Sequence, residues 1–279
     1  MKFENIQVYN FKHSLRGMRN PKNSWHLSDS KFGLTCEKYT IDIASNVAEA
    51  WCNSLDCIDE SKRDIEWDSK TNWLLNNGIL QNDEGICEYA FIGPKDMKLA
   101  KALIAGGSEH RKFLRQIMVT VDITAPLYWW KEFDTYKVGT TANSTSTMHK
   151  LTSKPITMEC FEIDDFNNIP YFCHINETQE FMTEELFSSI VDHLEKLRLK
   201  FLETTDKRYW KELVRLLPES WLQTRTVTMN YENLLSMIHQ RECHKLTEWS
   251  GTEIATPSFV KFAQSLPYAD SFIFVNKQS

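Results

Sequence analysis

The stretch from residue 117 to residue 149 constrains the fold of this chain more than any other part. Apolar β-branched residues alternate with Met, Thr and Asp over positions 117–123, and this period of two predicts a half-buried strand. Ala125-Pro126 ends the pattern, and Pro126 suits the first turn of a helix because its missing N–H needs no partner there. We therefore predict a helix over Leu127–Val138 that ends at Gly139. A strand and a helix this apolar must pack into a core, so the segment that follows them is held in place.

That segment is a run of short hydroxyl and amide residues. Because the packed strand and helix hold this run in place, it offers many fixed hydrogen-bond donors, which suit phosphate or sugar oxygens. Two other interpretations stay open. The run could be only a polar surface loop, and the aromatic side chains of the preceding helix could fill the core instead of stacking on a ligand. The run consists of Thr140, Thr141, Asn143, Ser144, Thr145, Ser146 and Thr147.

Composition limits the class of protein. The 279 residues suffice for one large domain or two small ones, and 42% hydrophobic with 25% charged residues is usual for soluble globular proteins. A net charge of −6 argues against non-specific binding to a nucleic acid polymer or an anionic membrane. No apolar run approaches the ~20 residues that cross a membrane. The first residues lack the apolar core of a signal peptide, so we expect a cytoplasmic protein.

The cysteines and common catalytic motifs give no specific signal. No CxxC pair occurs, so we predict reduced thiols and no metal site. The sequence also lacks a G-x-S-x-G elbow, a P-loop, an H-E-x-x-H motif and a dinucleotide-binding glycine motif. The seven cysteines are Cys36, Cys52, Cys57, Cys87, Cys160, Cys173 and Cys243.

The hydrophobic periods elsewhere mix helices with strands and predict one compact α+β domain over residues 1–279. We expect short strands and loops over 1–40, and acidic loops with one short helix around 73–75 over 56–95. Further strands are predicted over 156–163 and 224–229. The other predicted helices span 41–55, 96–105 with Asp96 as N-cap and Gly106-Gly107 as stop, 184–203 with Thr183 as N-cap, 207–216, 230–241 and 258–265.

Two groups of polar residues could bind anions. Asn230 and Arg241 are eleven residues apart, which in a continuous helix places them on one stripe, with an amide at its start and a guanidinium at its end. His110 opens a basic cluster ahead of the central strand. A solvated helix face and a solvated loop are the respective alternatives. The cluster consists of His110, Arg111, Lys112 and Arg115.

Together these pieces resemble the flavin-dependent thymidylate synthases, also called the thymidylate synthase complementing family, over residues 96–266. His110 stands ahead of the central strand, as a histidine does in the family. The polar run occupies the place of the family signature R-H-R-x-x-S-x-N-E-x-S-x-R-Y. The C-terminal block L-P…T-x-N-x-x-x-L…L-R is the most specific match, because several spacings agree together. Its residues here are Leu217-Pro218, Thr228-x-Asn230, Leu234-Leu235 and Arg241.

The signature departs from the family pattern. Its R-H-R triplet falls on Thr135, Tyr136 and Lys137, so one cation survives. Its N-E pair falls on Ala142-Asn143, and its later arginine falls on Thr147. Because charge-assisted hydrogen bonds are stronger than neutral ones, these losses should weaken the binding of anionic ligands, and the added hydroxyls compensate only in part.

The resemblance implies an α+β fold with a central, mostly antiparallel sheet and flanking helices, assembled as a homotetramer. It implies methylation of deoxyuridylate to thymidylate with methylenetetrahydrofolate, FAD and NADPH, and Arg241 as the catalytic residue. The implied FAD contacts are His110, Tyr136, Lys137, Asn230 and Ser236. The implied substrate contacts are Glu132, Thr140, Asn143, Thr145, Ser146, Thr147, Arg215 and Arg241.

The degenerate signature keeps two further functions open. A diverged enzyme could modify another pyrimidine nucleotide, for example by hydroxymethylation. A non-catalytic nucleotide-binding protein could have kept the scaffold and lost the flavin, because a fold does not determine a function.

Overall fold

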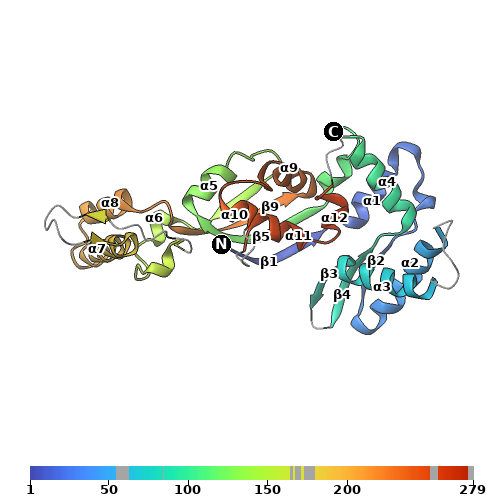
Figure 1. The fold of residues 1–279 in the computed structure, drawn as a ribbon, viewed down its shortest axis with the longest axis horizontal. Coiled ribbons are helices and arrows are strands. Elements are labelled where there is room, and N and C mark those ends of the chain that lie inside the picture. Colours follow the sequence, from blue (N-terminus) through green and yellow to red (C-terminus); the bar gives the residue numbers. More distant parts are fainter. Residues whose placement is uncertain are drawn as a thin grey trace. The chain divides into compact units, whose positions relative to one another are not determined.

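The computed structural model describes residues 1–54, 63–83, 85–163, 166, 171–172, 180–251 and 257–275. It divides the chain into two compact units, each described here by itself. Unit 1 comprises Met1–Lys2, Asp122–Tyr136 and Ala142–Thr226, and unit 2 comprises Phe3–Val121, Lys137–Thr141 and Val227–Ser279. Helices flank antiparallel strands, so the predicted α+β class is confirmed, while a single domain stays a prediction (Figure 1).

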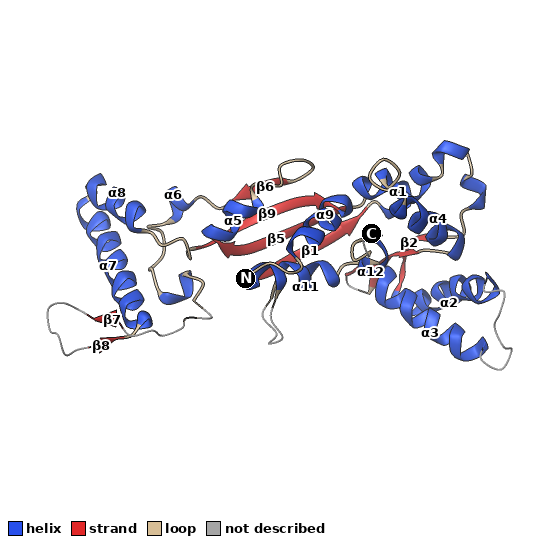
Figure 2. Cartoon of the chain, turned by 45° about the horizontal axis from the view of Figure 1, so that its top comes forward, coloured by secondary structure: helices blue, strands red, loops and turns tan. Residues whose placement is uncertain are grey.

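A four-stranded sheet has the order β1-β5-β9-β6 (Figure 2). Its strands are β1 Lys2–Tyr9, β5 Met118–Pro126, β9 Leu222–Asn230 and β6 Thr141–Ser144. In β5 every second residue from Val119 to Ala125 is buried, as the period of two predicts. Side-chain hydrogen bonds join Thr120 to Thr228 at 3.1 Å and Thr124 to Thr224 at 2.7 Å. The partners ascend in one strand and descend in the other, so β5 and β9 are antiparallel.

The core of unit 2 is aromatic. The Phe11 ring packs edge-on against the rings of Tyr231 and Tyr268, at centroid distances of 5.7 and 5.8 Å. Burial raises the pKa of both tyrosine hydroxyls. The Tyr268 hydroxyl donates to the Ala90 carbonyl at 2.7 Å. The helices of this core are α1 Phe11–Met18, α4 Pro94–Ala105, α9 Tyr231–Arg241, α10 Thr247–Ser250, α11 Phe259–Gln264 and α12 Ala269–Phe272.

A buried ion pair fastens the segment after α1 to α4. Arg19 Nε lies 2.5 Å from Asp96 Oδ1, and the two side chains are 5% and 0% exposed. The hydroxyls of Ser28 and Ser30 both donate to Asp96 Oδ2 at 2.6 Å. Asp96 was expected to cap α4, but Gly93 takes that position. A buried carboxylate needs several partners, and this network supplies three.

Unit 2 also contains a three-stranded sheet of order β2-β4-β3 that α2 and α3 cover on one face. Its strands are β2 Lys31–Cys36, β4 Ile86–Phe91 and β3 Ile79–Asp83, and its helices are α2 Glu37–Ser54 and α3 Arg63–Gly78. The predicted helix 41–55 is therefore confirmed. The short helix predicted around 73–75 lies within α3. The prediction of loops is wrong for the rest of 63–83 and for 86–91, and that of strands and loops over 1–40 misses α1.

Unit 1 packs its longest helix on a short one. The helices are α7 Thr183–Thr204 and α8 Lys207–Leu216, close to their predicted bounds, with α5 Leu127–Phe133 and α6 Thr147–Lys150. Leu194, Leu197 and Leu213 are buried in the shared core. A two-stranded sheet joins β7 Tyr171–Phe172 to β8 Glu180–Phe181.

Two predictions in unit 1 are wrong. The helix after Pro126 ends at Phe133 instead of Val138. Asp134 is its C-cap, the N–H groups of Thr135 and Tyr136 donate three residues back instead of four, and the Asp134 side chain pairs with Arg225 at 2.7 Å. Residues 156–163 form a 3-10 turn over Met158–Cys160 and one isolated bridge, not a strand. There the Ile156 N–H donates to the Glu195 side chain at 2.8 Å instead of to a neighbouring strand.

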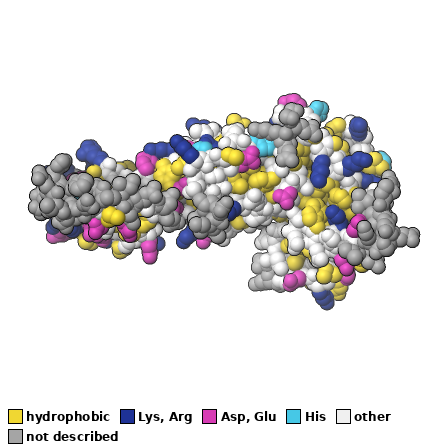
Figure 3. Space-filling model, in the orientation of Figure 1, with side chains coloured by type: hydrophobic (Ala, Val, Ile, Leu, Met, Phe, Trp, Pro, Cys, Tyr) yellow, Lys and Arg dark blue, Asp and Glu magenta, His cyan; other side chains and the backbone are white. Residues whose placement is uncertain are grey.

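Within the described ranges, no helix has the length and apolarity that a membrane crossing requires. The same ranges contain no group of three or more His, Cys, Asp or Glu side chains placed to hold a metal ion. Cys36, Cys52, Cys87, Cys160 and Cys243 are reduced, as predicted, and Cys57 and Cys173 lie outside the described residues. Basic and acidic side chains are interspersed on the face drawn in Figure 3.

Candidate functional site

The start of α9 is built by two asparagines. Asn230 Oδ1 accepts the backbone N–H of Asn233 at 2.9 Å, and Asn233 Oδ1 accepts the N–H of Asn230 at 3.2 Å. This reciprocal cap satisfies two backbone donors that a helix otherwise leaves open. Asn230 has extended backbone angles, φ −124° and ψ 168°. The predicted single helical stripe from Asn230 to Arg241 is therefore wrong, because Asn230 precedes the helix.

The loop that follows α5 reaches the same helix terminus within unit 2. Asn233 Nδ2 donates to the Val138 carbonyl at 2.8 Å. Gly139 has φ +80°, and a Cβ added there would lie 2.9 Å from Asn233 Oδ1 and 3.0 Å from Asn230 Nδ2. Only glycine satisfies both the backbone angle and the close approach. The structure thus places Lys137, which is exposed, and Thr140 in a loop fixed to the α9 cap.

The segment that carries His110 is tied to α9 as well. Arg111 Nε lies 3.0 and 2.9 Å from the two carboxylate oxygens of Glu232, in the first turn of α9. The Tyr231 N–H donates to the Ile117 carbonyl at 3.1 Å. His110 itself is exposed, and its ring lies against Gly106 at the end of α4. The basic cluster is therefore not wholly a solvated loop, since Arg111 is half-buried in an ion pair.

Arg241 is the last residue of α9 and is half-buried. Its guanidinium carbon lies 5.0 Å from the centre of the Trp249 ring, a cation–π distance. Trp249 is buried and packs against Phe259 at 5.1 Å, so this aromatic support is itself fixed. Ser236 lies between the two ends of the helix. It is exposed, and its hydroxyl accepts from Gln240 at 3.4 Å.

Unit 1 contains a side-chain network that sequence reasoning missed. Arg225 donates to Gln223 Oε1 at 3.0 Å and to Asp134 Oδ1 at 2.7 Å, and its guanidinium carbon lies 4.2 Å from the centre of the Trp130 ring. The Arg225 side chain is only 15% exposed. Trp130 is buried, so the core interpretation of the aromatic helix is right for Trp129 and Trp130. The buried Trp130 ring still contacts a cation, the guanidinium of Arg225.

The polar run attaches to this network. Gln223 Nε2 donates to the Thr145 carbonyl at 2.9 Å and to the Thr147 hydroxyl at 3.1 Å. The Thr145 N–H donates to the Thr224 carbonyl at 2.9 Å. Asn143 is exposed in β6 and Ser146 is half-buried. The run is therefore held at the edge of the sheet and is not a free loop.

Three predicted residues of unit 1 lie outside this network. Tyr136 is half-buried, and its ring packs on Phe133 at 6.5 Å. Glu132 is half-buried on α5. Arg215 is exposed in the last turn of α8, and none of the described contacts joins it to Arg225 or Gln223. The sequence gives only a weak indication that Arg225 is functional. In a strand whose side chains alternate between core and solvent, an arginine usually points to solvent.

No protein-family model and no curated protein matches the chain. The chain is similar to solved structures of low sequence identity. Flavin-dependent thymidylate synthase ThyX from Helicobacter pylori, complexed with FAD and dUMP, has a TM-score of 0.43 and 16% identity, over 86% of this chain and 95% of that chain. A second Helicobacter pylori ThyX structure with FAD and dUMP has a TM-score of 0.43 and 15% identity, over 89% and 97%. The UMP/dUMP methylase PolB from Streptomyces cacaoi, bound with 5-Br UMP, has a TM-score of 0.44 and 13% identity, over 64% and 82%.

Proposed function

We propose that the chain is a flavin-dependent enzyme that methylates deoxyuridylate to thymidylate, with methylenetetrahydrofolate as carbon donor and reduced FAD. The observation that carries this proposal is the form of the C-terminal block. Its Asn230 is the N-cap of α9, and its Arg241 is the last residue of the same helix. The residues whose spacing resembles the family thus lie in one strand and the helix that follows it. A polar side chain stands at each end of that helix.

The available donors of unit 2 fit a flavin dinucleotide, whose two phosphates need cations and N–H groups. Asn230 is 7% exposed, and its Nδ2 donates to no residue in the described part of the chain. A Cβ on Gly139 would lie 3.0 Å from this nitrogen, so glycine leaves the space beside it open. Lys137 is exposed in the loop fixed to the cap, and His110 is exposed beside the Arg111–Glu232 pair. These three residues and Ser236 would hold the flavin nucleotide. Tyr136 is proposed as a further FAD contact from the resemblance in sequence alone. When bound, the flavin supplies the hydride.

Arg241 would act on the pyrimidine. A guanidinium is always protonated, and a fixed positive charge beside the pyrimidine ring stabilises negative charge that develops on it. Stacking on Trp249 restrains the guanidinium. Arg241 is therefore able to bind the substrate and stabilise the transition state with the same group.

The nucleotide end would be bound by the polar run with Glu132, Arg215 and Arg225. The run offers hydroxyl and amide donors at Thr140, Asn143, Thr145, Ser146 and Thr147. Arg225 adds a cation that the degenerate signature lacks, and its position over Trp130 is fixed. We further propose NADPH as the source of reducing equivalents and a homotetramer as the assembly, both from the resemblance in sequence. The cytoplasm stays the expected location.

Growth of thymidine-requiring cells tests the activity. The chain should restore growth without thymidine, and Arg241→Ala should abolish the rescue. Arg208→Ala is the matched control, because that arginine side chain is 91% exposed and pairs only locally with Asp206. Rescue by Arg241→Ala at the wild-type level would remove Arg241 from the mechanism.

The replaced signature favours one second candidate, modification of a different pyrimidine nucleotide, for example hydroxymethylation. An amide at Asn143 and a hydroxyl at Thr147 stand where the family has an acid and an arginine, so the base or the product could differ. No rescue, together with a new nucleotide formed from folate and reduced flavin, would select this candidate. If the protein binds nucleotide but no flavin, it is the non-catalytic binding protein.

A further inference from the structure

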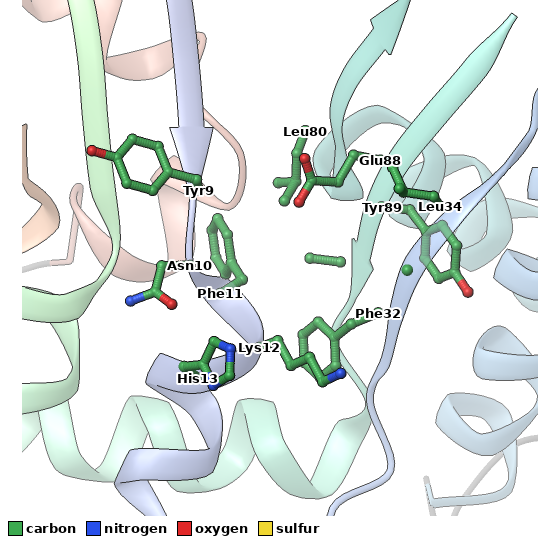
Figure 4. Close-up of a pocket in the computed structure, with 12 residues that line it drawn as sticks. Tyr9, Asn10, Phe11, Lys12, His13, Phe32, Leu34, Leu80, Glu88 and Tyr89 are labelled. Atoms are coloured by element: carbon green, nitrogen blue, oxygen red, sulfur yellow. The ribbon is translucent and has the colours of Figure 1, made fainter.

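A cavity of about 480 Å³ in unit 2 shares no lining residue with the site proposed above. One side is formed by the end of β1 and the first turn of α1, and the other by β2, β3 and β4 (Figure 4). Its volume lies within the range of ~300–1,000 Å³ in which proteins bind small molecules. The cavity is therefore large enough for a ligand of nucleotide size.

The sheet side of the cavity is the face that α2 and α3 leave uncovered. Phe32 lies opposite Ala90, and Leu34 lies opposite Glu88. Directly opposed residues of an antiparallel pair, and every second residue along a strand, share a face. All four therefore point to the cavity side. Tyr89 is on the other face, where it packs against the core beneath α2 and α3 and points away from the cavity (Figure 4).

Opposite charges lie at opposite ends of this cavity. In Figure 4, Glu88 and Leu80 are at one end, and Lys12, His13 and Phe32 are at the other. Among the described residues, Lys12, His13 and Glu88 make no ion pair and no side-chain hydrogen bond. Lys12 and His13 are exposed and Glu88 is half-buried. These three polar groups are thus available to a ligand.

The arrangement selects a ligand by its chemistry. An ammonium and an imidazole side by side suit a phosphate, which carries more charge and more acceptor oxygens than a carboxylate. A carboxylate is acceptor-only, so Glu88 suits an amino group and rejects a carbonyl oxygen. Phe32 and Leu34, on the sheet side of the cavity, present apolar surface to a ring. We propose that this cavity binds a nucleoside monophosphate whose base carries an exocyclic amino group, with the phosphate at Lys12 and His13 and the amino group at Glu88.

The test is calorimetric titration of the full chain with dCMP in the presence of saturating dUMP. The two nucleotides differ in the amino or carbonyl group at C4 of the base. Saturating dUMP fills the nucleotide site of the proposed function, so the heat from dCMP reports on the cavity alone. If the chain binds no dUMP, the proposed function fails, while the titration with dCMP still tests the cavity.

We expect one dCMP to bind per chain. Glu88→Gln and Lys12→Ala should each weaken its binding at least about tenfold, the effect of losing a charged hydrogen bond. Glu4→Gln, an exposed change on β1 outside the cavity, should leave binding unchanged. The proposal is overturned if the folded protein gives no heat with dCMP, if dUMP abolishes dCMP binding, or if Glu88→Gln binds dCMP like the wild type. Binding of free tyrosine in place of dCMP would also overturn it, because the site would then recognise an amino acid.

Discussion

The segments 222–241 and 135–147 are held by different kinds of interaction. In the first, β9 runs into α9 through the reciprocal cap of Asn230 and Asn233, whose partners are three residues apart. In the second, α5 ends early and Gln223, about 80 residues further along the chain, holds the polar run, while Arg225 bonds Gln223 and Asp134. Local capping is visible in a sequence, whereas a distant side-chain network is not.

Gly139 joins the two segments, and its replacement should have the largest effect. Gly139→Ala should destabilise unit 2 by about 3 kcal/mol, because it adds left-handed backbone strain to a clash with the Asn233 and Asn230 amides. Thermal unfolding followed by circular dichroism measures the change. Gly107→Ala is the matched control, since Gly107 has φ +90° and open space around it, and should cost only the strain of about 1 kcal/mol. Equal losses in the two variants would show that the loop is not docked on α9.

Arg225 tests whether the network in unit 1 replaces the missing cations. Arg225→Ala should weaken dUMP binding about 30-fold, equivalent to about 2 kcal/mol, because a fixed guanidinium is lost. Arg225→Lys should recover only part of this, since an ammonium cannot reproduce the contacts to Gln223, Asp134 and Trp130 together. Equilibrium dialysis with labelled dUMP measures both. Unchanged binding in Arg225→Ala would mean that the cation only holds Asp134.

Asn230 allows the cap to be separated from flavin binding. Asn230→Ala should cost about 1 kcal/mol of stability through the lost cap and should also weaken FAD binding. Asn230→Ser keeps a capping oxygen but removes the amide N–H groups, so it should keep the stability and still lose FAD affinity. Chemical unfolding and flavin fluorescence measure the two effects. A serine variant with wild-type FAD affinity would limit Asn230 to capping.

The Glu195 side chain also holds a distant segment, because it accepts the backbone N–H of Ile156. Replacing Glu195 should have the smallest effect of the changes proposed here. Hydrogen bonds from Arg198 lower the pKa of the Glu195 carboxyl, with a further contribution from the Ile156 N–H. Because the Glu195 pKa is lower in the folded state than in the unfolded state, its ionised carboxylate stabilises the fold at pH values above the unfolded pKa of about 4.3. This stabilisation is lost as the pH falls through the pKa of the folded state. Glu195→Gln should cost less than about 1 kcal/mol at neutral pH, and the difference should vanish in acid.

Urea unfolding at a series of pH values measures this effect. Glu212→Gln, an exposed change on α8, should show no comparable loss. A Glu195→Gln difference that stays constant down to acidic pH would contradict the ion pair as its cause.

The elements predicted best are those whose signals are local. The helix over 230–241 follows from buried Leu234, Leu235 and Ile238. The α7 and α8 bounds agree within a residue or two for the same reason. The strands β3 and β4 were missed because helices cover only one face of their small sheet. Outward-facing apolar residues, such as Ile86 at 54% exposure, therefore break the expected alternation.

The candidate site was predictable only in part. Asn230 and Arg241 were identified from spacing, and the structure gives each a fixed place. The end of α5 was not predictable, because the side chain of its C-cap, Asp134, is held by an ion pair with Arg225, 91 residues away in sequence. Tertiary contacts of this kind override helix propensity. For the same reason Arg225 and Gln223 carried no signal before the fold was known.

The visible absorption spectrum of the purified protein, recorded after FAD is added and the excess is removed, tests the central claim most directly. We expect a retained flavin band that dUMP perturbs, because Lys137, Asn230 and His110 supply enough donors to hold the cofactor without the family triplet. If protein that is folded by circular dichroism shows no band at saturating FAD, flavin-dependent thymidylate synthesis is not the function.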